Sequence, residues 1–304
     1  MVISEIVQTV SELSIFTILF AFVISVVTIY FGSLIFQYIG KGFGQHITTK
    51  DSFTINYLAL FVGYLVPFKP GSLALKVVIT RLISKVELKY ATLILVAENV
   101  FYFFWQIPLL IALLFLSGFS FVGFKSGGFI SLIVFIILLI TFILKPDIVL
   151  ISKKIIPKKL LRKYSKIDSF IDSIGTSQRS FLQLKILVPI IIFSLILLFI
   201  SPLFIKLADG VVTNQLSYLQ AFTVFWISYV IGKISFFSDG FGVKDLALGA
   251  LLLTYGLSSF DALQVVVLFR VFTILPILVI GGLFLIFTGK KIPLKQLIKK
   301  PHKV

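Results

Sequence analysis

The sequence predicts an all-α polytopic membrane protein that contains an inverted-topology repeat, with about five full transmembrane helices and two re-entrant broken-helix hairpins. Of the 304 residues, 59% are hydrophobic and only 13% are charged. A soluble domain is about 45–50% apolar and about 25% charged. Long apolar runs also alternate with basic loops, and Gly-containing breaks interrupt the pattern twice. Lipid is therefore the expected solvent for most of this chain, because its polar surface is too small to cover a globule in water.

The apolar runs define the expected elements, because a helix needs about 20 apolar residues to cross the hydrocarbon core. The runs expected to span are, in chain order, Ser14–Ile39, Leu88–Leu116, Gly128–Leu144, Ile186–Ile205 and Phe260–Thr288. Four shorter runs form two pairs, each interrupted by a break. These are Phe53–Val66 with Ser72–Ile83 around PFKPG, and Ala221–Phe237 with Leu246–Leu257 around SDGFGVKD.

The two halves of the chain match when Gly71 is aligned with Gly240, which sets GYLVPFKPGSLALK against GKISFFSDGFGVKD. A short apolar run, a polar turn and a long apolar helix follow each break. That helix carries Glu98 in the first half and Arg270 in the second. We expect a single transmembrane domain over 1–289 and a basic cytoplasmic tail over 290–304. Within the domain the expected parts are repeat one (about 14–117), a linking helix (128–144), a cytoplasmic basic loop (145–185) and repeat two (about 186–289).

Loop charges predict the orientation. The chain has 28 Lys and Arg against 12 Asp and Glu, and the basic residues gather in 145–185 and after Thr288. Because cytoplasmic loops are rich in Lys and Arg, these segments are expected inside and the N-terminus outside the cell (plasma) membrane. Loop 206–220 is then also outside. The two hairpins must enter from opposite faces, the first from the cytoplasm. The basic excess lies between apolar runs, so it does not predict a nucleic-acid partner.

Two stretches resemble the lysylphosphatidylglycerol synthase transmembrane (flippase-like) family. They are NYLALFVGYLVPFKPGSLALKVVITR, from Asn56, and GFGVKDLALGALLLTYGLSSFDALQVVVLFR, which ends at Arg270. The resemblance extends from about Asn56 to Gly282. Positions that match the family by residue type are Asn56, Pro67, Lys69, Gly71, Glu98, Gly240, Gly242, Lys244, Asp245 and Arg270, whereas Ser72, Leu75, Ser238 and Asp239 depart from it.

What the resemblance implies is lipid translocation. Some family members join this module to an aminoacyltransferase domain. Only a short tail follows Lys290 here, so the expectation is a stand-alone member with no synthase activity.

Charged groups at membrane depth are costly and by default face a cavity or each other. A helix that begins after a glycine break also offers free backbone N–H groups that suit a phosphate. We therefore expect the two hairpin tips to meet near the midplane in a cationic, phosphate-accepting cavity. The predicted substrate-binding residues are Lys69, Gly71, Lys76, Glu98, Asp239, Gly240, Gly242, Lys244, Asp245 and Arg270.

The sequence allows more than one role for several of these residues. Glu98 and Arg270 could form an ion pair between the repeats, as a structural clamp or as a substrate contact. Asp245 could cap a helix N-terminus or receive an amine from an aminoacyl lipid. Lys76 and Lys233 could extend to the membrane interface. Asn56 is expected to hydrogen-bond between helices.

The expected function is transport of an anionic, aminoacylated or phosphate-bearing lipid across the bilayer. The alternative is an intramembrane enzyme or an accessory subunit acting on polyprenyl-phosphate or glycolipid substrates. The sequence has no cysteine and only two histidines, which lie far apart at His46 and His302. No catalytic constellation, metal site or cofactor is therefore expected. The expected partner is a membrane lipid, with a second copy of the chain or a membrane enzyme as further candidates.

Overall fold

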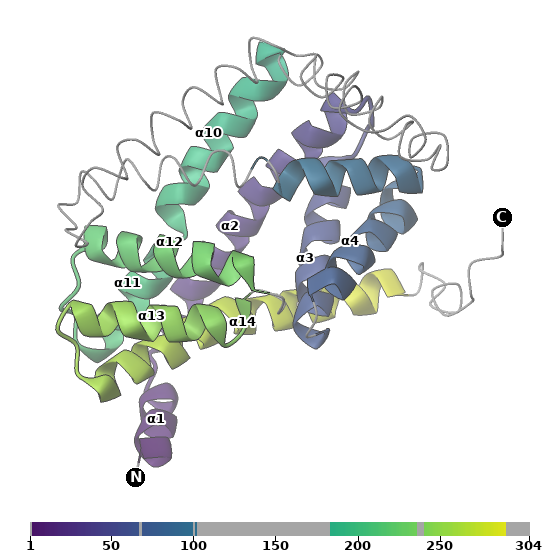
Figure 1. The fold of residues 1–304 in the computed structure, drawn as a ribbon. Coiled ribbons are helices and arrows are strands. Elements are labelled where there is room, and N and C mark those ends of the chain that lie inside the picture. The colour runs from purple at the N-terminus through teal and green to yellow at the C-terminus, as the bar shows by residue number, and fades with distance from the viewer. Residues whose placement is uncertain (1, 67–68, 100, 102–182, 236–239, 290–304) are drawn as a thin grey trace, which may run out of the picture.

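The computed structural model describes residues 2–66, 69–99, 101, 183–235 and 240–289 (Figure 1). This part of the chain contains helices and no strand. The helices are α1 (Val2–Ser11), α2 (Ile15–Gly42), α3 (Thr49–Leu65), α4 (Lys69–Ser84), α10 (Leu184–Ile200), α11 (Leu203–Val212), α12 (Tyr218–Ile234), α13 (Val243–Thr254) and α14 (Ser259–Gly289). A further helical segment covers 88–99. The expected linking helix, the part of the expected span Leu88–Leu116 beyond 101, most of the basic loop and the tail lie outside the described residues.

The membrane class is confirmed by length and composition. Among the described residues, three segments are long and apolar enough to cross a membrane: Ile15–Gly42, Leu184–Val212 and Ser259–Phe287. Their outer faces carry large exposed apolar side chains such as Phe16, Leu184 and Phe287. Such a surface would be unfavourable in water, whereas it matches the hydrocarbon of a bilayer.

The second of these segments corrects one prediction. A span ending at Ile205 and an outside loop over 206–220 were expected, but α11 continues the helical path to Val212. Asp209 is fully buried, and its carboxylate accepts hydrogen bonds from Lys206 Nζ (3.2 Å) and from the backbone N–H of Leu216 (3.0 Å). These contacts close the turn from α11 to α12. Lys206 and Asp209 therefore belong to a packed helix end.

The two pairs of short runs form two helical hairpins, as the sequence predicts. α3 packs against α4, and α12 packs against α13. The four helices have 17, 16, 17 and 12 residues, each below the length of about 20 that spans a bilayer. Figure 1 shows the hairpins on opposite sides of the molecule, and α14 contacts both α3 and α13.

Local sequence explains where these helices begin. Ser14, Thr48 and Ser217 precede α2, α3 and α12, and each side-chain oxygen accepts a hydrogen bond from the backbone N–H three residues later. Gln220 completes a capping box with Ser217. These caps satisfy N–H groups that would otherwise lack partners in an apolar medium.

The apolar interior has two main clusters, and α2 and α10 contribute to both. Ala21 and Ile24 of α2 pack with Leu198 and with residues of α11 to α14. Ile35 and Phe36, further along α2, pack with α3, α4 and the helical segment 88–99. Each half thus builds its own core around its hairpin, and the long helices connect the two cores.

Candidate functional site

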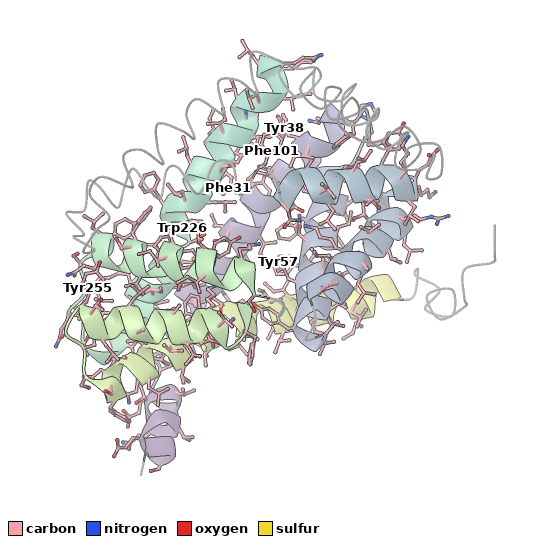
Figure 2. All side chains as sticks on the ribbon, in the orientation of Figure 1. Phe31, Tyr38, Tyr57, Phe101, Trp226 and Tyr255 are labelled. Carbon is pink, nitrogen blue, oxygen red and sulfur yellow. The ribbon has the colours of Figure 1, made fainter. Side chains whose placement is uncertain are left out.

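A cavity of about 350 Å³ lies between the two hairpins. Both hairpins line it, together with α2, α10, α14 and the helical segment 88–99. Its charged lining residues are Lys76, Glu98, Lys233 and Lys244, and its smaller polar groups include Ser25, Thr28, Asn56, Ser72, Asn99 and Thr273. Trp226, labelled in Figure 2, lines it from α12 and donates its Nε1–H to the Leu198 carbonyl (2.9 Å). The described lining therefore carries three ammonium groups and one carboxylate.

Lys76 and Glu98 form a buried ion pair on the wall given by the first hairpin. Lys76 Nζ lies 2.9 and 2.7 Å from the two carboxylate oxygens of Glu98, and the side chains are 14% and 8% exposed. The Lys76 ammonium also lies 4.8 Å from the centroid of the Phe36 ring. The pair joins α4 to the segment 88–99, and the carboxylate compensates the cation at a depth where neither charge is well hydrated.

Lys244 occupies an aromatic cage on the wall given by the second hairpin. The side chain is buried, and its Nζ lies 4.8, 5.3 and 5.6 Å from the ring centroids of Phe269, Phe225 and Tyr229. Lys233 Nζ lies 4.9 Å from the same Tyr229 ring. Ring faces attract cations, so these rings help to hold two ammonium groups at the cavity.

A second ion pair lies beside the cavity. Arg270 Nε and Nη2 donate to the two carboxylate oxygens of Asp245 at 2.6 and 3.0 Å. Asp245 also accepts from the backbone N–H of Gly242 (3.0 Å). The guanidinium lies 5.2 Å from the centroid of the Phe241 ring. Asp245 therefore caps α13, satisfies the backbone N–H of Gly242 and ties α13 to α14.

This pairing differs from the one expected between Glu98 and Arg270. Glu98 binds Lys76, and Arg270 binds Asp245. Each ion pair thus connects the second arm of a hairpin to the helix that follows it in the same half of the chain.

Close approach of glycines shapes the second hairpin. Gly240 has a φ of 68°, and a Cβ built on it would lie 2.6 Å from the Cα of Gly232. A Cβ on Gly232 would lie 2.9 Å from the Cβ of Lys244. Only glycine fits both positions, because the start of α13 passes directly over the end of α12.

The structure places the predicted residues at different distances from the cavity. Lys76, Glu98 and Lys244 line it, whereas Asp245, Arg270, Gly240 and Gly242 form the adjoining start of α13 and its tie to α14. Gly71 lies in the first turn of α4, where a Cβ would meet Val66 at 3.0 Å. Lys69 begins α4, and its side chain and Asp239 lie outside the described residues.

Asn56 donates from Nδ2 to Ser33 Oγ of α2 (3.1 Å), which confirms the expected bond between helices. Lys76 ends in an ion pair within the protein instead of extending to an interface. Sequence reasoning missed the cage of Phe225, Tyr229 and Phe269. The spacing of four between Phe225 and Tyr229 places both rings on one helix face, but Phe269 lies on another helix.

A family model described as the lysylphosphatidylglycerol synthase TM region matches residues 1–281. No curated protein and no solved structure matches the chain.

Proposed function

This chain belongs to the lysylphosphatidylglycerol synthase transmembrane family, and we propose that it moves an anionic, phosphate-bearing lipid across the plasma membrane. The observation that carries the proposal is the cavity between the hairpins, whose described lining holds three lysines and one glutamate. The membrane class and the family support a role with lipids. The choice of an anionic head group comes from the chemistry of the lining.

Cations at membrane depth mark sites for substrates or ions, because keeping them there is costly. Two of the three ammonium groups, on Lys233 and Lys244, lie against aromatic rings. A phosphate oxygen is a strong acceptor for such ammonium groups. Apolar side chains such as Leu197, Phe204 and Ile277 complete the lining, and they suit the glycerol and upper acyl region of a lipid.

The transport cycle we propose uses the two hairpins as inverted repeats that open the cavity alternately to the two faces. The similar order of elements around α3–α4 and α12–α13 supports this proposal, as does the position of the cavity between them. In the proposed orientation the N-terminus is outside and the C-terminus is cytoplasmic.

Proteoliposomes with acyl-labelled fluorescent lipids test the proposal. Phosphatidylglycerol, phosphatidylserine and phosphatidic acid should cross faster than in protein-free vesicles, and phosphatidylcholine should not. Lys244→Met should lower the transport rate of the anionic lipids about tenfold or more, because it removes a buried phosphate-binding cation. Lys50→Met, at an exposed position on α3, is the matched control and should transport normally.

The same samples are analysed for lipid breakdown products. Movement of no lipid, or chemical turnover of a lipid phosphate in place of movement, overturns the transporter proposal and favours the enzyme alternative.

A further inference from the structure

The described lining of the cavity includes a pair of opposite charges that an anionic head group would disturb. Lys76 and Glu98 both line it, and the carboxylate of Glu98 binds the Lys76 ammonium with both oxygens. A phosphate that binds Lys76 competes with that carboxylate. Asp245 and Arg270 form the ion pair beside the cavity, and neither residue lines it.

We propose that Glu98 takes up a proton when an anionic lipid head group replaces it at Lys76, so that anion binding and proton binding are coupled at this pair. This inference rests on the proposed lipid-transport function and adds a second transported or bound species, the proton.

Charge accounting supports the coupling. In the empty cavity, Lys76 and Glu98 cancel each other. An added phosphodiester brings one negative charge, and a displaced Glu98 carboxylate at 8% exposure would be an unpaired charge in a poorly hydrated site. Such charges are strongly unfavourable. One proton from the buffer, added to a carboxylate oxygen of Glu98, removes that unpaired charge while Lys76 stays protonated and binds the phosphate. The charge of the phosphodiester itself faces Lys76 and the two other lysines of the lining, Lys233 and Lys244.

The surroundings of Glu98 favour this outcome. Several neighbouring elements offer it no second cation: the lining residues from α2, α10 and α14 are apolar, hydroxyl or glycine residues. Asn99 is the next residue in the chain and carries no charge. Among the residues that the structure describes, the titratable ones that share the cavity with Glu98 are Tyr64 of α3, Lys76 of α4, Tyr229 and Lys233 of α12, and Lys244 of α13. Lys233 and Lys244 are held at Tyr229 on the opposite hairpin.

Isothermal titration calorimetry of the full chain in detergent tests the coupling. The probe is short-chain phosphatidylglycerol, a phosphodiester that does not itself titrate near neutral pH. Titrations at one pH in two buffers of different ionisation enthalpy report the number of protons taken up. We expect about one proton per bound lipid, and by linkage an affinity that rises about tenfold for each unit fall in pH.

Two variants assign the proton. Glu98→Gln should bind phosphatidylglycerol with no proton uptake and with an affinity independent of pH. At neutral pH it should bind more tightly than the wild type by about tenfold or more, because no carboxylate competes for Lys76. Glu87→Gln changes an exposed carboxylate just before the same helix and should behave as the wild type does.

The outcomes separate the two proposals. Binding of phosphatidylglycerol by the wild type without proton uptake overturns the coupling and leaves the transport proposal standing, and this result needs no variant to fold. Proton uptake that persists in Glu98→Gln overturns the assignment to Glu98. Absence of binding, together with no movement of any anionic lipid in proteoliposomes, overturns the transport function and this inference with it.

Discussion

Lys76 and Asp245 occupy matching positions in the two hairpins, five residues after Gly71 and Gly240, and each binds a residue of opposite charge on the next long helix. Lys76 binds Glu98 and Asp245 binds Arg270, so the polarity of the pair is reversed between the halves. Each pair ties the second arm of a hairpin to the helix that follows it in the chain. Only the first pair lines the cavity. The two halves therefore arrange their helices similarly but do not both place an ion pair at the cavity.

Lys76→Met should destabilise the protein by about 3–5 kcal/mol, because it leaves the Glu98 carboxylate buried without its cation. The midpoint of thermal unfolding in detergent measures this effect. The double variant Lys76→Met with Glu98→Gln should be closer to wild type. A double variant as unstable as Lys76→Met alone would contradict this account of the pair.

Arg270→Lys should lower stability by about 1.5–3 kcal/mol even though the charge is kept. A lysine cannot reproduce the two parallel bonds from Nε and Nη2 to Asp245, and hydrogen bonds to charged groups contribute on this scale. Unfolding in detergent is again the measurement. Lys206→Arg is a useful comparison on α11. An unchanged midpoint for Arg270→Lys would show that the bidentate geometry is dispensable.

Gly240→Ala and Gly242→Ala should differ although both glycines have positive φ values, 68° and 79°. At Gly240 a new Cβ meets backbone atoms of Gly232 from 2.6 Å, whereas nothing lies within 4 Å of one at Gly242. Gly242→Ala should therefore lower the free energy of unfolding only by the cost of a positive φ for alanine, about 1–2 kcal/mol. Gly240→Ala should lower the free energy of unfolding by about 3 kcal/mol or more, because α12 and α13 must move apart to make room for the new Cβ. Equal losses would contradict the close approach of the two helices.

Cysteine labelling tests the proposed orientation, and the chain has no cysteine of its own. Gln215 and Glu87 are both exposed, the first between α11 and α12 and the second just before the segment 88–99. Gln215→Cys should react with an impermeant maleimide added outside intact cells, and Glu87→Cys only after the membrane is permeabilised. Labelling of both positions from one side would overturn the inverted arrangement.

Part of the site was predictable from the chain alone. The Gly-containing breaks between short apolar runs predicted the hairpins, and the charged residue types Lys76, Glu98 and Lys244 marked three positions that line the cavity. The pairing of Glu98 was not predictable. Glu98 and Arg270 match in sequence order, but partners in space depend on how each helix is rotated about its axis, and that rotation is set by packing.

By itself, the sequence determined the membrane class, the three long apolar helices that the structure describes and the two hairpins. These features follow from length, hydrophobicity and glycine position, which act locally along the chain. The tertiary structure alone decided that α11 extends the segment after α10, that Asp209 is buried within it, and that three rings from two helices enclose Lys244. Those outcomes depend on contacts between residues distant in sequence. The free energy of burying a charge therefore selects its partner only once the helices have packed.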